Sequence, residues 1–229
     1  MAFYRGPNVV TDGLVLAIDA ANTKSYPGSG TTWSDISGNN RNVTLVNGPS
    51  FANSGSGAIV FDGTNDSLSF STITFSNTSY AIEMFGNLTG TIEPTANRRS
   101  IFGNASYASE FSNTTTFFTN LTVNSVDTYF NFGFSTAGSL VTGQDFHWVF
   151  TLDFSTKNVF IYLNGKSITS ADTQLTSYTN ISTTFTRFGI WTTIRPYIGN
   201  LYYARMYNKY LTSSEVLQNY NAQKSRFGL

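Results

Sequence analysis

The sequence predicts an all-β protein, a two-sheet antiparallel β-sandwich with one short C-terminal helix. About a dozen short segments alternate apolar and polar residues, which is the period of a half-buried strand. Turn signals rich in glycine separate these segments, and no helix-length apolar pattern lies between them to build a βαβ unit. Aromatic residues make up 16% of the chain, which suits strands with one buried and one solvated face.

The first half of the chain contributes short strands joined by tight turns. Residues 13–20 alternate in hydrophobicity, and residues 43–51 and 58–70 surround turns at Asn47-Gly48 and Asp62-Gly63. These dipeptides tolerate the positive φ that two-residue hairpin turns demand. Residues 79–88 then supply a further strand.

The second half begins with three aromatic runs at the spacing of a strand meander, in residues 100–107, 115–123 and 128–134. A hairpin follows, formed by residues 145–154 and 158–168 around an Asn164-Gly165 turn. The last two strands are predicted in residues 187–194 and 200–210.

The final strand carries several tyrosines and changes period into a helix over about residues 212–223. Alternation places Leu201, Tyr203, Arg205 and Tyr207 on one strand face. Strand alternation favours packing as the role of most of these tyrosines.

The helix begins with a capping-box signature, Thr212 followed by Glu215. Val216, Leu217 and Tyr220 recur at helical spacing, so we expect them to cover an edge of the sandwich core.

The 229 residues fit one domain, residues 13–229, preceded by an N-terminal arm, residues 1–12. The arm contains Gly6-Pro7 and unpartnered side chains, notably Phe3, Tyr4 and Arg5, and we expect it to dock on a neighbouring protein. The sequence shows no signal-peptide pattern and no apolar run of membrane-spanning length.

Composition excludes several classes of function. The chain has no cysteine, so disulfides, thiolate metal sites and cysteine nucleophiles are absent. Charged residues are only 11% of the chain and the formal net charge is zero, without the basic face that nucleic-acid binding needs. Polarity comes from Asn, Ser and Thr instead.

An ordered set of motifs resembles a known family. From about residue 12 to the C-terminus, the chain carries GLVLAIDA, WSDISGNNRNVTLVNGPSF, IVFDGTNDSLSF, YAIEMF, HWVFTLDF, VFIYLNG and GNLYYARMYNKYLTSSEVLQNYNA. This order resembles the laminin-G-like, concanavalin-A-like jelly-roll domains, and most of all the free-standing ones among structural proteins of tailed bacteriophages. The resemblance implies that the last strand returns beside the first and that a helix caps one end. It leaves function open, because members bind glycans, bind proteins or act as passive modules.

The sequence offers no complete catalytic constellation. Glu83 is the one acid on its strand, whereas glycosidases of this broad fold need a second carboxyl roughly 5 to 9.5 Å away. Only an acid from elsewhere, such as Glu93, Asp145 or Asp153, could complete the pair. We therefore expect Glu83 to be paired structurally or to face solvent, and we expect no enzymatic activity.

His147 is the only histidine, and alternation places it opposite Trp148 on its strand. We expect Trp148 and its stripe to pack in the core, with His147 on the other face. No G-x-S-x-G elbow accompanies the abundant serines, so a hydrolytic triad is not indicated.

Calcium is the one candidate cofactor. Many proteins of the resembling fold hold Ca²⁺ with loop oxygens at one rim, and the DGTND segment offers Asp62, Asn65 and Asp66 as ligands. The same Asp-Gly pair also suits a plain turn. No glycine-rich phosphate loop supports a nucleotide cofactor.

The sequence and the resemblance together predict a non-enzymatic structural or accessory protein of a virion, in the capsid decoration, tail or fibre. Its partners would be other virion proteins and further copies of itself, with no nucleic acid. The alternative is a carbohydrate-binding, lectin-like adhesion module that contacts cell-surface glycans, and a glycoside hydrolase ranks last. The first aromatic candidates for a glycan or partner contact are Trp191, Tyr202, Tyr203 and Tyr207.

Overall fold

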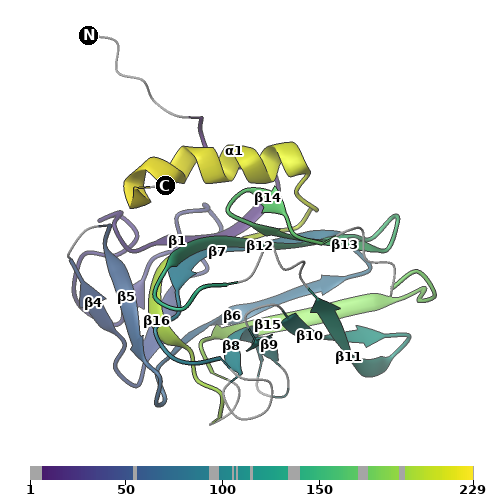
Figure 1. Cartoon of the computed structure of the whole chain (residues 1–229), viewed down its shortest axis with the longest axis horizontal. Helices are drawn as coiled ribbons and strands as arrows, with labels where there is room; N and C mark the ends of the chain where they lie inside the picture. Colours follow the sequence, from purple (N-terminus) through teal and green to yellow (C-terminus); the bar gives the residue numbers. More distant parts are fainter. Residues whose placement is uncertain are drawn as a thin grey trace.

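In the computed structural model, two antiparallel sheets pack face to face, and one helix lies on the outside of the first sheet (Figure 1). The predicted all-β sandwich is therefore confirmed. The structure describes residues 7–53, 56–92, 98–104, 106, 108–113, 116–133, 140–169, 175–190 and 194–228.

The first sheet contains the two ends of the domain. Its strands are β1 (Leu14–Asp19), β4 (Ser50–Ala52), β5 (Ala58–Asp62), β7 (Tyr80–Asn87), β12 (Asp145–Asp153), β13 (Asn158–Leu163), β14 (Lys166–Ser167) and β16 (Ile198–Tyr207). Their order is β14-β13-β12-β7-β16-β5-β4, and β1 also pairs with β16. Leu16 lies opposite Met206 in that pairing, so the last strand returns beside the first, as the resemblance implies.

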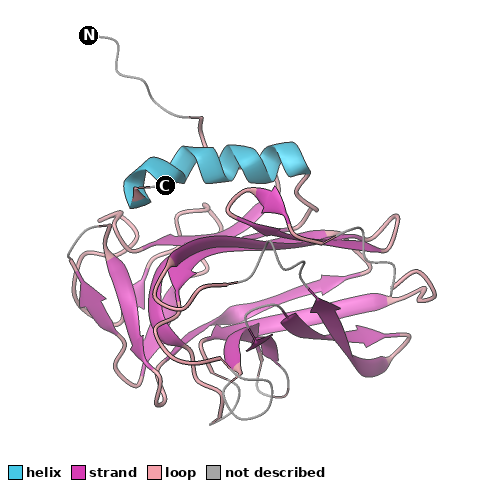
Figure 2. Ribbon diagram, in the orientation of Figure 1, coloured by secondary structure: helices cyan, strands magenta, loops and turns pink. Residues whose placement is uncertain are grey.

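The second sheet runs β11-β10-β9-β8-β15-β6-β3-β2, with an additional pairing between β10 and β15. Its strands are β2 (Thr32–Trp33), β3 (Val43–Val46), β6 (Ser67–Ser76), β8 (Arg99–Gly103), β9 (Ala108–Asn113), β10 (Thr116–Val123), β11 (Val126–Gly133) and β15 (Ile181–Phe188). Figure 2 shows the helix on the far side of the sandwich from β8, β9, β10 and β11.

Two of the turns show why the hairpins form where Asn-Gly pairs occur. Asn47 and Gly48 have φ values of 66° and 103°, and Asn164 and Gly165 have 50° and 75°. Positive φ at both central residues is the requirement of the turn that matches strand twist.

The strand predicted in residues 187–194 is wrong in its position. β15 ends at Phe188, and Gly189 follows with a φ of 95°, which breaks the strand. The strand draws instead on the Ser- and Thr-rich segment before Arg187, which carries little of the hydrophobic signal used to assign strands.

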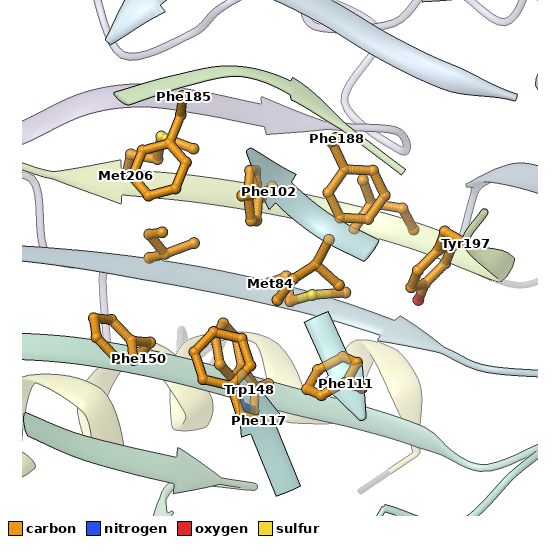
Figure 3. Packing of buried hydrophobic residues seen from close by; sticks show 14 of the residues in the cluster. Met84, Phe102, Phe111, Phe117, Trp148, Phe150, Phe185, Phe188, Tyr197 and Met206 are labelled. Carbon is orange, nitrogen blue, oxygen red and sulfur yellow. The ribbon is translucent and has the colours of Figure 1, made fainter. Parts of the chain in front are cut away.

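The core lies between the sheets and is largely aromatic (Figure 3). Trp148 is fully buried, with its ring centroid 4.8 Å from that of Phe117 and 5.5 Å from that of Phe111. Edge-on and tilted pairs of this kind stabilise a core beyond their buried area. The prediction that Trp148 packs in the core and His147 lies on the opposite face is confirmed.

A β-bulge in β16 corrects the predicted face pattern of the last strand. Leu201 lies opposite Gly86, but Tyr203 lies opposite Phe85, so one residue of β16 is extra. Leu201 therefore points into the core, while Tyr202 and Tyr203 both pack on the outer face.

The C-terminal helix α1 (Ser213–Gln223) begins as predicted. Thr212 accepts a hydrogen bond from the Glu215 amide, and the Glu215 side chain accepts one from the Thr212 amide. Val216 is buried, as predicted, but the prediction for Leu217 is wrong because its side chain is 46% exposed. Asn219 occupies the buried position instead.

Two short stretches flank this helix. The 3₁₀-helix η2 (Lys224–Phe227) follows it and stacks Phe227 on Phe85, with ring centroids 3.7 Å apart. At the other end of the chain, Val10 packs in a cluster with Val216 and donates its amide to Asn219 Oδ1 at 2.7 Å. Part of the predicted arm thus contacts its own domain, while Phe3, Tyr4 and Arg5 lie outside the described residues.

None of the helices in the described part of the chain has the length and hydrophobicity to cross a bilayer.

Candidate functional site

The second sheet contains a gap beside β15. At its start β15 pairs with β10, where Ile181 lies opposite Val123, and at its end it pairs with β8, where Phe188 lies opposite Phe102. Because β8 pairs with β9 and β9 with β10, the four strands close into a ring. Within the described residues, positions 183–186 have no ladder partner on this side of β15.

A cavity of about 270 Å³ occupies this gap. Asn104 Nδ2 bridges it, donating to the Thr184 carbonyl at 3.1 Å, since no strand partner reaches that carbonyl. The lining is polar apart from two phenylalanines, an alanine and a glycine, and consists of Phe102, Gly103, Asn104, Ala108, Ser109, Asn120, Thr122, Asp127, Thr183, Thr184 and Phe185.

The β10–β11 hairpin brings an aromatic ring and a carboxylate to the same face. Asn120 lies opposite Tyr129, and Thr122 lies opposite Asp127, so the four side chains share the outer side of the sheet. Tyr129 is 56% exposed, unlike the buried aromatic residues of the core. Thr122 Oγ1 donates to Asp127 Oδ1 at 2.7 Å and so orients the carboxylate.

Asn120 has a hydrogen-bonding group that the protein leaves unsatisfied. Its residue is only 6% exposed, yet its buried Nδ2 has no acceptor among the described residues. A buried donor without a partner costs about 1–3 kcal/mol, so such groups ordinarily mark a water or a ligand. Asn120 is one of the residues that line the cavity, so the unsatisfied donor belongs to its wall.

The arrangement is suited to a polyhydroxylated ligand. Sugar hydroxyls both donate and accept hydrogen bonds, and the site offers amide donors, hydroxyls and the acceptor oxygens of Asp127. The exposed ring of Tyr129 provides an apolar surface with a polar tip beside them. A concave site with a few convergent polar groups is the usual form of a small-molecule site.

Glu83 forms a second polar cluster on the outer face of the first sheet, beneath α1. One carboxylate oxygen accepts from His147 Nε2 at 2.9 Å and from Arg205 Nη1 at 3.0 Å, and the other accepts from Asn219 Nδ2 at 2.8 Å. Tyr203 and Tyr207 hydroxyls complete it, each at 3.2 Å.

The cluster is fully buried and keeps Glu83 ionised. Burial alone would raise the pKa of Glu83, but the positive charge of Arg205 and the hydrogen bond and charge of His147 lower it to about 2. Burial likewise opposes the charge of Arg205, but Glu83 raises the pKa of this guanidinium above its ordinary value. The expectation that Glu83 is paired structurally matches this geometry.

Two of the acids named as partners for Glu83 lie too far along the sheet. Val149 is the residue opposite Glu83, and Asp145 and Asp153 are four residues to either side of it, about 13 Å along the strand. Glycosidase carboxyls are separated by roughly 5 to 9.5 Å. The third candidate, Glu93, lies outside the described residues.

The aromatic residues predicted to contact a glycan or partner lie elsewhere. Tyr203 and Tyr207 are fully buried in the Glu83 cluster, and Tyr202 is buried against η2, where its hydroxyl donates to Asp145 Oδ1 at 2.8 Å. Burial together with that hydrogen bond raises the pKa of Tyr202 to about 12. These three residues have packing roles, and Trp191 lies outside the described residues.

The residues predicted to bind calcium form a turn. Asp66 Oδ2 accepts from the Asp62 amide at 2.9 Å, and Asp62 Oδ1 accepts from the Thr64 amide at 2.7 Å. The Asn65 carbonyl accepts from Asn47 Nδ2. Among the described residues, no group of three or more His, Cys, Asp or Glu side chains is positioned to hold a metal.

Sequence reasoning missed Asn120, Asp127 and Tyr129. They lie in a stretch interpreted only as a strand meander, and the alternation of FTNLTVNSVDTYFNF does separate them from the inward phenylalanines. Nothing in the sequence indicated the gap, because the strand that lines it was predicted several residues too far along the chain.

Comparison with models of protein families and with curated proteins gave no match. Solved structures do resemble the fold. Domain 4 of an extracellular arabinanase from Geobacillus stearothermophilus, in complex with arabinotriose, is 18% identical with a TM-score of 0.63, covering 90% of this chain and 97% of that one. The binding domain of Paraclostridial Mosquitocidal Protein 1 is 15% identical with a TM-score of 0.67, covering 93% of this chain and 52% of that one.

The ligand-binding domain of botulinum neurotoxin serotype D, in complex with N-acetylneuraminic acid, is 14% identical with a TM-score of 0.65, covering 93% of this chain and 52% of that one. This chain spans about half the length of the toxin binding domains that it matches. At these identities the likeness establishes a shared β-sandwich fold, and two of these neighbours were solved in complex with a carbohydrate.

Proposed function

We propose that this chain is a non-enzymatic carbohydrate-binding module whose site is the gap between β15 and the β8–β9–β10 strands. The observation that carries the proposal is the unsatisfied amide of Asn120, a residue that lines a polar cavity and lies opposite the exposed Tyr129 in the ladder. The fold shared with a domain solved in complex with arabinotriose supports the same function.

The position of the site supports binding by an open surface. In the described part of the chain, α1 and η2 both pack on the first sheet, and no helix covers the outer face of the second. That face presents small hydroxyl side chains, such as Thr74 and Thr184, whose Oγ1 atoms lie 3.1 Å apart. A glycan could approach it without displacing any described element.

The absence of catalysis is part of the proposal. The carboxylate that could act as a nucleophile, Glu83, is buried under α1 and held by five donors. Catalysis would need a substrate-accessible acid pair, and neither Asp145 nor Asp153 supplies the second member. We expect the protein to release no reducing sugar from any polysaccharide that it binds.

The experiment is a glycan array, followed by titration calorimetry on the glycans that are retained. Tyr129→Ala should weaken binding about fivefold or more, because a central aromatic contact is worth more than about 1 kcal/mol. Val126→Ala is the matched control, since Val126 is also exposed on β11 but alternation places it on the opposite face of the strand from Asp127 and Tyr129. Retention of no glycan, or equal affinities for Tyr129→Ala and wild type, would refute the proposal.

Asn120→Ala separates function from stability. Removing an amide that has no partner should leave the midpoint of thermal unfolding unchanged or raise it, while binding weakens. A loss of both together would instead indicate that Asn120 has a structural role.

A place on a virion is a further part of the proposal, supported by the resemblance of the ordered motifs to structural proteins of tailed bacteriophages. In that setting the module would bind a cell-surface glycan while other virion proteins, and other copies of the chain, hold it in the particle. Mass spectrometry of purified particles tests this directly. The protein should be present at high copy number, and its absence would refute the proposed location on a virion.

A further inference from the structure

Arg187 differs from the other arginines of the described chain. It makes no hydrogen bond or ion pair with any described residue, although the guanidinium carries five donors. Each of the other six has a protein acceptor, namely Arg41 on the Thr72 carbonyl, Arg98 and Arg195 on Glu110, Arg99 on the Thr91 carbonyl, Arg205 on Glu83, and Arg226 on Asp19.

Arg187 lies on β15, three residues beyond Thr184 of the gap cavity. In the ladders it lies opposite Ser69 of β6 on one side and Gly103 of β8 on the other. Gly103 lines the gap cavity, so the backbone of Arg187 adjoins the site already described. Three residues of strand span at most about 10 Å, which lies within the length of a short oligosaccharide.

A second cavity, of about 410 Å³, opens beside Arg187. The polar residues that line it with Arg187 are Asn47, Asn65, Ser67 and Ser69, and Asn47 Nδ2 already donates to the Asn65 carbonyl. Uncharged donors around one unpaired guanidinium form a site for an anion, because a carboxylate accepts from both the guanidinium fork and neighbouring hydroxyls. Among the residues that line this cavity none is an acid that would compete.

The surrounding charges favour an anion at this end of the sheet. Glu110 lies on β9, which β8 separates from β15, and it is already paired with both Arg98 and Arg195, a group with a net positive charge. Asp127 lies at the opposite side of the gap cavity and would repel an anion there. A ligand would therefore bind with its neutral part near Tyr129 and its charged part near Arg187.

We propose that the binding surface is built for an acidic glycan, and that Arg187 binds the carboxylate or sulfate of a sugar next to the one held in the gap. This inference rests on the proposed carbohydrate-binding function and specifies its ligand class. The ligand would give Arg187 the acceptor that the described residues do not supply.

The test uses the full chain and pairs of glycans that differ only in the acidic group, for example sialyllactose and lactose, a uronic-acid oligosaccharide and its neutral counterpart, and a sulfated glycan and its unsulfated form. The wild type should bind the acidic member of a pair more tightly, and raising the salt concentration should weaken that preference. Arg187→Gln should lose about tenfold or more in affinity for the acidic member, the effect expected for a hydrogen bond to a charged group, and should bind the neutral member as before.

Lys166→Gln is the matched control, because it removes the same charge from an exposed position on β14 of the other sheet. It should leave both affinities unchanged, and thermal unfolding should show that both variants fold. Equal binding of acidic and neutral glycans, or an acidic preference that survives in Arg187→Gln, would overturn this inference while the carbohydrate-binding function stands. Binding of no glycan at all would overturn both. The sulfated and carboxylated pairs identify which anion the site takes.

Discussion

The outer faces of the two sheets use polar residues in opposite ways. On the first sheet, Glu83 lies under α1 and receives five hydrogen bonds from side chains of β12, β16 and α1. On the second sheet, which no described helix covers, the Nδ2 of Asn120 and the guanidinium of Arg187 have no hydrogen-bond acceptor among the described residues. The hydrogen bonds of the Glu83 cluster hold the helix on the first sheet, whereas Asn120 and Arg187 each line a cavity that a ligand could enter.

The largest effect is expected from disrupting the Glu83 cluster on the outer face of the first sheet. Glu83→Gln removes the charge that compensates buried Arg205, and removing one partner of a buried pair costs about 3–5 kcal/mol. Urea denaturation should show this loss in the free energy of unfolding. The control is Asp12→Ala, since Asp12 pairs with Lys209 at an exposed position where ion pairs contribute about 0–1 kcal/mol. Equal, small losses for both variants would mean that the cluster does not hold the helix.

A smaller loss of stability is expected when the residue that α1 contributes to the same cluster is replaced. Asn219→Ala removes the donor to Glu83 and the acceptor of the Val10 amide, and we expect a loss of about 1–3 kcal/mol. Leu217→Ala is its neighbour-matched control and should change stability by less than about 0.5 kcal/mol, because Leu217 is exposed. A larger loss for Leu217 than for Asn219 would reverse the assignment of the buried helix face.

The pH dependence of stability compares one acid from each sheet. Glu83 has a lowered pKa, so its contribution is present above about 4.5 and is lost as the pH falls toward about 2. Burial raises the pKa of Glu110 despite its arginine partners, so its ionisation costs stability and acidification from neutral pH toward 4.5 relieves that cost.

Chemical denaturation across this pH range should therefore show two opposite slopes. The free energy of unfolding should increase as the pH falls from neutral toward 4.5, and Glu110→Gln should flatten this increase. It should then decrease as the pH falls further toward about 2, and Glu83→Gln should reduce this decrease. A pH profile that neither variant changes would show that the two carboxyls do not titrate as their surroundings require.

The sequence revealed the strands that are rich in apolar residues, as in residues 80–87 and around Trp148, although the structure buries both faces of these two strands. It failed where a polar group is the right choice for a buried position. Leu217 was predicted to face the sandwich because it is apolar. The face of α1 that packs on the sheet lies over the Glu83 carboxylate, and Asn219 occupies that face because its amide can donate to Glu83. No hydrophobic period reports such a pairing.

The site was hidden for a related reason. β15 is a strand of serines and threonines, and its weak hydrophobic signal moved the predicted strand to the segment after Arg187. Asn120 and Tyr129 come together through ladder register, and sequence patterns give register only where one face is clearly apolar. The buried tyrosines of β16 looked more like a binding surface than the exposed Tyr129, because a β-bulge and a covering helix cannot be read from composition.

The central claim is that a glycan binds the uncovered face of the second sheet, and mapping backbone amide shifts by NMR during a titration with a bound glycan tests it most directly. We expect shifts concentrated in β10, β11 and β15, around Asn120, Tyr129 and Thr184, with little change in α1 and β16. Shifts centred on α1 and β16, around Tyr203 and Asn219, would contradict it and would move the binding site to the covered face.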